Sequence, residues 1–108
     1  MTSAPARGHV FRVEISDYGP KPYAVVSNNK RNKALDSVLA VRVTTTDKSA
    51  IPTAVPLTSL DPLAGFALAD NIVEIFKDEL EEGTCLGSLS PATIVKLNAA
   101  LAQALGIP

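Results

Sequence analysis

The chain has 108 residues, of which 46% are hydrophobic and 19% are charged. This length fits a single domain over residues 1–108, and the apolar content excludes a disordered chain. The only cysteine, Cys85, excludes an internal disulfide. The first residues lack the pattern of a signal peptide, and no apolar run approaches the ~18–20 residues of a membrane span, so we expect a cytoplasmic protein that does not enter a membrane.

Charge is distributed unevenly along the chain, although its net value is only −1. The first fifty residues contain eight Lys or Arg and four Asp or Glu, a balance of +4. The remainder contains two Lys and seven Asp or Glu, a balance of −5. Unless the two halves mix in space, this distribution predicts a basic surface that could bind nucleic acid despite the acidic total.

The first half of the chain predicts three strands. Residues 8–15 alternate between apolar and polar side chains, which is typical of a half-buried strand. A Gly- and Pro-rich turn at 17–22 leads to an apolar strand over Tyr23–Ser27, and the two strands suggest a hairpin. Residues 28–36 are polar and indicate a loop, whereas Ser37–Thr44 is rich in β-branched residues and predicts the third strand. We expect residues 1–6, before the first strand, to be flexible.

The second half predicts further short strands and one clear helix. The expected segments are a polar turn at 45–50, an edge strand at 53–57, a turn at 61–65, a strand within 66–76 centred on 71–75, a charged turn or single helical turn at 77–83, and a short strand at 86–89. The helix begins after Ser90, a good N-cap, with Pro91 in its first position, and it ends at Gly106. Its apolar stripe is formed by Ile94, Leu97, Leu101 and Leu105.

These elements predict a mainly β fold with a C-terminal α-helix, either a small SH3-like antiparallel barrel or a curled sheet. The sequence offers little for a metal or cofactor, and we expect neither. One His and one Cys do not make a zinc site of any usual spacing, and the acidic residues at 79–82 are typical of a solvated face. His9 has the same parity as Phe11 and Val13, which favours packing at the core edge over acid–base chemistry.

RNA can be cleaved without a metal, because the ribose 2′-OH beside the scissile phosphate is a nucleophile that the substrate itself supplies. The enzyme must hold this group in line, stabilise extra negative charge on the phosphorus oxygens, and move protons. A cation next to the phosphate and a nearby hydroxyl therefore suffice for the electrostatic part of the task.

Several motifs occur along the chain in a characteristic order and spacing. They are Arg7-Gly8-His9-Val10-Phe11, Lys21-Pro22 followed by an apolar strand to Ser27-Asn28, Val41-Arg42-Val43-Thr44, Ile51-Pro52-Thr53, Asn71-Ile72 and Lys77-Asp78-Glu79-Leu80. Together they resemble the MazF/PemK family of toxins, in its mycobacterial or actinobacterial branch. The resemblance extends from Arg7 to Gly106, and its PemK-type fold agrees with the barrel or curled sheet expected above.

The resemblance implies a sequence-selective endoribonuclease toxin of a type II toxin–antitoxin system, of the mRNA interferase type. Members of this family cut single-stranded RNA without a metal and leave a 2′,3′-cyclic phosphate. They work as homodimers and are neutralised by a cognate antitoxin. An acidic, partly disordered segment of such an antitoxin would fit a basic groove and exclude RNA from it.

By the same resemblance, the catalytic cation falls on Lys21 and the catalytic hydroxyl on Thr44. The family more commonly has Arg where this chain has Lys21, and Lys lacks the planar fork with which Arg grips a phosphate. Further positive charge could come from Arg7, Arg31 or Arg42. The residues expected to bind RNA are Arg7, Tyr18, Ser27, Asn28, Asn29, Arg31, Arg42, Thr45, Thr46 and Asn71.

Two alternatives remain open on the sequence alone. A gyrase-poisoning toxin of the same barrel class would act by protein contact, but proteins of that group have a Trp near the chain end and this chain has none. A catalytically silent module that binds RNA or a peptide is the second alternative, and the Lys at the family's Arg position favours it.

Overall fold

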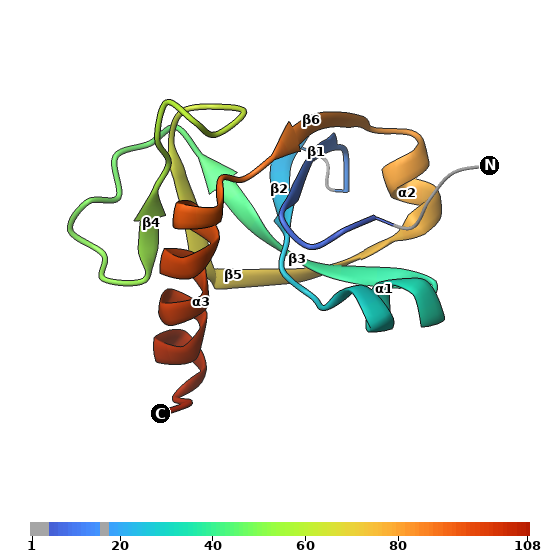
Figure 1. Ribbon diagram of the computed structural model, residues 1–108. Coiled ribbons are helices and arrows are strands. Elements are labelled where there is room, and N and C mark those ends of the chain that lie inside the picture. The colour runs from blue at the N-terminus through green and yellow to red at the C-terminus, as the bar shows by residue number, and fades with distance from the viewer. Residues whose placement is uncertain (1–4, 16–17) are drawn as a thin grey trace.

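The computed structural model describes residues 5–15 and 18–108 (Figure 1). The expectations for residues 1–4 and for Asp17 in the first turn lie outside the described residues. The elements in chain order are β1 (His9–Val13), β2 (Lys21–Val25), α1 (Asn29–Ala34), β3 (Ser37–Thr44), β4 (Ala54–Pro56), β5 (Phe66–Phe76), α2 (Lys77–Glu81), β6 (Thr84–Ser88) and α3 (Pro91–Leu105). No helix in this part of the chain combines the length and the apolar composition needed to cross a membrane.

The strands form one six-stranded sheet in the order β4-β5-β3-β2-β1-β6, with antiparallel pairing throughout. The sheet is open, and Figure 1 shows its edge strands β4 and β6 on opposite sides of the molecule. The curled sheet is therefore confirmed and the closed barrel is wrong. Closure would require β4 to pair with β6, but β4 has only three residues, and its last residue, Pro56, lacks an N–H for a ladder.

The sheet carries an aliphatic core on each face, because successive side chains of a strand point in opposite directions. Val41 and Val43 of β3 belong to the core covered by α3, which includes Leu97. Val38 and Ala40 of the same strand belong to the second core, which includes Leu80 of α2. A strand buried on both faces has a continuous run of apolar residues. This run predicts the bounds of β3, and the structure confirms them.

Helix α3 begins and ends where the sequence predicts. The Ser90 hydroxyl accepts a hydrogen bond from the Thr93 N–H at 3.3 Å, and Pro91 is the first helical residue. Gly106 ends the helix with a left-handed φ of 71°. Leu97 is buried and Ile94 packs against the core, but Leu105 is 59% exposed, so the predicted stripe fails at its last residue.

Several segments differ from the expectations. Strand β2 begins and ends two residues earlier than the predicted Tyr23–Ser27. Residues 28–36, expected to form a loop, contain α1, whose N-terminus is capped by the side chain of Asn28. Strand β5 has eleven residues and so extends well beyond the 71–75 segment, and β6 begins two residues earlier than predicted. The charged segment after β5 does form the single helical turn α2.

Candidate functional site

Lys21 and Thr44 lie at the same end of two paired strands. Lys21 is the first residue of β2, and Thr44 is the last residue of β3. The β2–β3 pairing ends with Tyr23 opposite Arg42, so Lys21 and Thr44 each lie two residues beyond the last pair. There Lys21 pairs with Val13 of β1, and Thr44 pairs with Phe66 of β5. Because side chains two residues apart along a strand share a face, Lys21 and Thr44 lie on the same face as the Tyr23–Arg42 pair. Both residues are half-buried.

Arg42 lies on the same face as Lys21 and Thr44, because it is two residues from Thr44 along β3. Its Nε donates a hydrogen bond of 3.0 Å to the carbonyl oxygen of Val43. This contact keeps the guanidinium near the end of β3. A second positive charge therefore accompanies Lys21 on this part of the sheet.

The Thr44 side chain is oriented by the turn that follows β3. Its Oγ1 accepts a hydrogen bond of 3.2 Å from the backbone N–H of Thr46. A threonine hydroxyl that accepts one bond still has its own proton to donate. Thr45 and Thr46 are exposed and follow directly, so three hydroxyls are concentrated at this strand end.

Tyr18 lies in the turn that precedes β2, three residues before Lys21, and its side chain is 84% exposed. An exposed aromatic ring at this position has an accessible face for a nucleobase. His9 is half-buried instead. Its Nδ1 accepts a hydrogen bond of 3.1 Å from the Ala6 N–H, and its ring meets Phe11 edge-on with centroids 6.1 Å apart, as expected for a residue at the core edge.

Asn71 lies where β5 departs from regular pairing. The β3–β5 ladder passes from Val41↔Ile72 to Val43↔Ala67, so more residues of β5 than of β3 lie between these pairs. Asn71 is exposed there and lines a pocket of about 210 Å³ together with Lys48, Ile51, Thr53, Ala54, Leu68 and Asp70. The Thr53 hydroxyl donates a hydrogen bond of 2.7 Å to Asp70, which orients that carboxylate in the pocket wall.

Arg7, Asn28 and Asn29 form a separate group beyond the opposite end of β2. The Arg7 N–H donates a hydrogen bond of 2.8 Å to Oδ1 of Asn29, and its guanidinium bonds Asn98 of α3. The Asn28 side chain caps α1. Strand β2 alone spans about 13 Å at ~3.3 Å per residue, so within one chain these residues are distant from Lys21.

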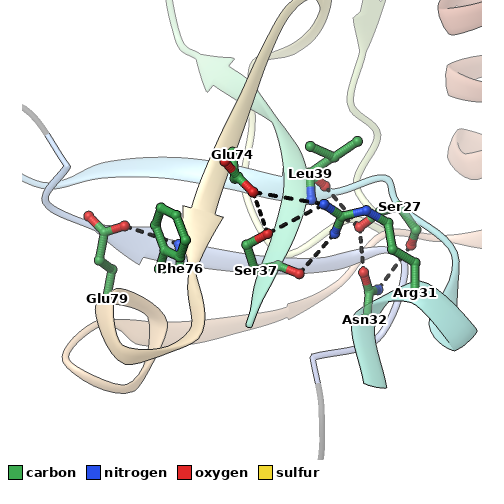
Figure 2. A network of polar contacts seen from close by, with 8 residues as sticks. All are labelled: Ser27, Arg31, Asn32, Ser37, Leu39, Glu74, Phe76 and Glu79. Atoms are coloured by element: carbon green, nitrogen blue, oxygen red, sulfur yellow. Dashed lines mark hydrogen bonds and ion pairs between the residues drawn. The ribbon is translucent and has the colours of Figure 1, made fainter. Parts of the chain in front are cut away.

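Ser27 and Arg31, two of the predicted RNA-binding residues, belong to an internal polar network (Figure 2). Ser27 is buried, its hydroxyl donates to Asn32, and it accepts a hydrogen bond of 3.0 Å from the Leu39 N–H. Asn32 returns a bond of 3.0 Å to the Ser27 carbonyl.

Arg31 of α1 extends this network to strands β3 and β5 of the sheet. Its Nη1 donates a hydrogen bond of 2.8 Å to the Ser37 carbonyl, and its Nη2 lies 3.9 Å from the Glu74 carboxylate. Ser37 also donates a bond of 2.6 Å to Glu74. These contacts give Ser27 and Arg31 a structural role, holding α1 on the sheet, and their contact with RNA stays a prediction.

Asp61, which the sequence does not single out, has a carboxylate that links the β4–β5 connection to the start of α3. It accepts hydrogen bonds from Ser90 N–H (2.7 Å), Thr58 N–H (2.7 Å), Thr93 Oγ1 (2.7 Å) and Thr58 Oγ1 (3.1 Å). Partial burial acts to raise the pKa of this carboxyl, but the four hydrogen bonds outweigh it, so the pKa is lowered. The available signal was an Asp in a turn, which by itself indicates only the turn.

The sequence matches a known protein family and a named relative over nearly its whole length. The family model described as "PemK-like, MazF-like toxin of type II toxin-antitoxin system" matches residues 6–105. Endoribonuclease MazF4 of Mycobacterium tuberculosis is 51% identical over 106 residues, which cover 98% of this chain and 97% of that protein.

Solved structures agree with this similarity. An endoribonuclease from a mycobacterial species, in complex with its cognate antitoxin, is 51% identical, with a TM-score of 0.91 and coverage of 97% of this chain and 98% of that one. MazF in a MazE–MazF structure from Deinococcus radiodurans has the same fold at 21% identity, with a TM-score of 0.84 over 99% of this chain and 100% of that one.

Proposed function

The chain belongs to the family of PemK-like, MazF-like toxins of type II toxin–antitoxin systems, and we propose that it cuts single-stranded RNA at selected sequences by attack of the ribose 2′-OH. It is an endoribonuclease of the MazF type. The observation that supports this activity best is 51% identity to a MazF endoribonuclease over nearly the full length of both chains. The shared strand end of Lys21 and Thr44 supports the proposed chemistry.

In the proposed reaction, the 2′ oxygen forms a bond to the scissile phosphorus while the bond from phosphorus to the 5′ oxygen breaks. The 2′-OH gives up its proton, and the departing 5′ oxygen takes one up. The products are a 2′,3′-cyclic phosphate and a 5′-OH end. Because the substrate supplies the nucleophile, the protein has to supply orientation, charge stabilisation and proton movement.

Lys21 supplies positive charge to the phosphorane-like transition state, and the Thr44 hydroxyl donates a hydrogen bond to a non-bridging oxygen. The Lys ammonium acts as a point charge, so it stabilises the phosphate without a two-point grip. Arg42, on the same face, adds a second charge. This arrangement accounts for cleavage with Lys at the position where the family more commonly has Arg.

The proposed RNA-binding residues divide into two groups. Tyr18, Thr45 and Thr46 surround the cleaved phosphate with one aromatic ring and two hydroxyls, and Asn71 offers an amide in its pocket for a base edge. Arg7, Asn28 and Asn29, beyond the far end of β2, contact RNA further from the cut. No cofactor or metal has a role in the proposed reaction.

We further propose that the active form is a homodimer in the cytoplasm and that a cognate antitoxin neutralises it. An acidic, partly disordered antitoxin segment would occupy the basic surface and compete with the RNA backbone for the same cations. A mycobacterial endoribonuclease that is 51% identical has been solved with its cognate antitoxin, which supports this partner class. Light scattering of the purified protein tests the dimer directly.

The cleavage proposal is tested by incubating the purified protein with a long unstructured RNA in EDTA and mapping the new 5′ ends. We expect cuts at a recurring short sequence, with 5′-OH ends and 2′,3′-cyclic phosphates. A substrate with 2′-deoxyribose at the cut position should bind and remain intact. Binding without cleavage of the all-ribose RNA, by protein whose circular dichroism shows the native fold, would instead favour the silent RNA-binding module.

A further inference from the structure

We infer that Gly65 is a positioning residue for Thr44, and that the β4–β5 connection acts as a brace between the start of α3 and the catalytic strand end. By the brace we mean residues 57–65. This inference rests on the proposed function, because it takes Thr44 as the hydroxyl that contacts the scissile phosphate. It makes the cleavage rate depend on a residue that does not itself contact RNA.

Gly65 lies directly against the backbone of Thr44. A Cβ atom at Gly65 would be 2.2 Å from the Thr44 carbonyl oxygen, 3.0 Å from its carbonyl carbon and 3.4 Å from Cα of Thr45. Gly65 also has a φ of 131°, which side-chain-bearing residues rarely adopt. Both observations require glycine, and the contact is with backbone atoms, which cannot rotate away as a flexible side chain does.

Backbone pairing holds Gly65 from the other side. Its carbonyl accepts a hydrogen bond of 2.8 Å from the Leu57 N–H, just after β4. The next residue, Phe66, pairs with Thr44 of β3 and with Pro56 of β4. Gly65 is therefore fixed against β4 while it contacts the end of β3, so a displacement at Gly65 is transmitted to Thr44.

Asp61 anchors the middle of the brace. Its four hydrogen bonds, to Thr58 within the brace and to Ser90 and Thr93 at the start of α3, tie this segment to the longest helix. The lowered pKa of its carboxyl agrees with a carboxylate stabilised in place. Leu63 packs against the core that α3 covers, which adds an apolar contact to the polar one.

The brace thus links α3 to Thr44 through the hydrogen bonds of Asp61 and the close backbone contact of Gly65. A methyl group at Gly65 forces Thr44 or the brace to move by about 1 Å, the scale of displacement that costs about 10²-fold in rate when a catalytic group is misplaced. RNA affinity depends on many contacts away from Thr44, so it should change far less than the rate.

The test compares Gly65→Ala with Gly106→Ala, a matched control. Gly106 also has a positive φ, of 71°, but a Cβ atom there would meet nothing within 4 Å. We expect the single-turnover cleavage rate of Gly65→Ala to fall about 10²-fold, with little change in Kd for a 2′-deoxy substrate analogue. Gly106→Ala should cleave at the wild-type rate. An unchanged rate in folded Gly65→Ala would overturn the inference.

A double-mutant cycle separates positioning from general damage. If Gly65 acts through Thr44, Gly65→Ala should cause no further loss in rate when Thr44 is already Ala, because the misplaced group is absent. An equal loss in both backgrounds would show that Gly65 only maintains the fold and would overturn the inference. Amide NMR provides an independent readout, since Gly65→Ala should shift the Thr44 and Thr45 signals and Gly106→Ala should not.

Asp61→Asn is the second variant, to be used if Gly65→Ala does not fold. It weakens the anchor without a steric clash, and we expect about a tenfold loss in rate that likewise disappears in the Thr44→Ala background. A wild-type rate in Asp61→Asn would overturn the role of the anchor. Full activity of Thr44→Ala would overturn the assignment of Thr44 and this inference together, whereas inactive Thr44→Ala with active Gly65→Ala overturns only this inference.

Discussion

Lys21 and Thr44 lie at the same end of the antiparallel β2–β3 pair, each two residues beyond the last partners, Tyr23 and Arg42. Between them in the sequence lie the rest of β2, helix α1 and the rest of β3. The antiparallel pairing of β2 with β3 brings the ammonium and the hydroxyl to the same end of the sheet. Since both side chains lie on one face at this end of the sheet, we expect both to reach the same phosphate.

Lys21→Ala should lower kcat by about 10²–10³-fold, which corresponds to about 3–4 kcal/mol, the loss expected when one donor to developing oxyanion charge is removed. Lys21→Arg should retain most of the activity, because it keeps the positive charge. The measurement is the cleavage rate of an RNA oligonucleotide that spans one mapped site. Lys33→Ala, which removes an exposed lysine from α1, is the charge-matched control and should cleave normally. Wild-type activity in Lys21→Ala would remove Lys21 from the site.

Thr44→Ala should lower kcat by about 10²-fold, whereas Thr44→Ser should retain most of it, because the transition state uses only the hydroxyl. Thr45→Ala and Thr46→Ala should act mainly on KM, as expected for groups that bind RNA without touching the reacting oxygens. Thr84→Ala, at an exposed threonine of β6, is the control for loss of a hydroxyl. If Thr45→Ala instead lowers kcat as far as proposed for Thr44, the catalytic hydroxyl belongs to Thr45.

The sequence predicts those elements that local rules determine. The bounds of β3 follow from its β-branched run, and those of α3 follow from Ser90, Pro91 and Gly106. Helix α1 is not predicted because it has six residues, too few for an apolar period, and because Arg31 also contacts Glu74 of the distant strand β5. Local patterns likewise do not reveal the open edges of the sheet.

The candidate site likewise has features that the sequence predicts and contacts that it does not. Its residue types can be predicted from the order of the motifs, but not the internal use of Ser27, because that depends on a register with Leu39. Gly65 appears in the sequence as an ordinary turn glycine. Its contact with Thr44 exists only because β5 pairs with β3, which lies more than twenty residues earlier in the chain.

Ser27→Ala should destabilise the protein and leave the chemistry intact. The substitution leaves the Leu39 N–H and the Asn32 side chain short of a partner, at a cost of about 1–3 kcal/mol for buried polar groups. Urea denaturation measures this loss in the free energy of unfolding. Ser88→Ala, at an exposed serine of β6, should be close to neutral. A stable Ser27→Ala protein with weakened RNA binding would contradict the structural role and restore Ser27 as an RNA contact.

Asp61 should make the stability of the protein depend on acidic pH. Its pKa is lower in the folded protein than in the unfolded chain, so the unfolded chain binds the proton first as the pH falls. The stabilisation is therefore complete above the ordinary Asp value of about 4 and is lost as the pH drops through the lower folded value. Titration of other groups is common to the wild type and Asp61→Asn, so the difference between their free energies of unfolding isolates this carboxyl.

We expect this difference to favour the wild type by about 1–2 kcal/mol at pH 7, the scale of hydrogen bonds to a charged acceptor. It should shrink as the pH is lowered from about 4 through the lower folded pKa. Urea denaturation at a series of pH values measures it. A difference that stays constant over this range would mean that the charge of Asp61 does not hold the brace. The anchor would then have to come from the apolar packing of Leu63.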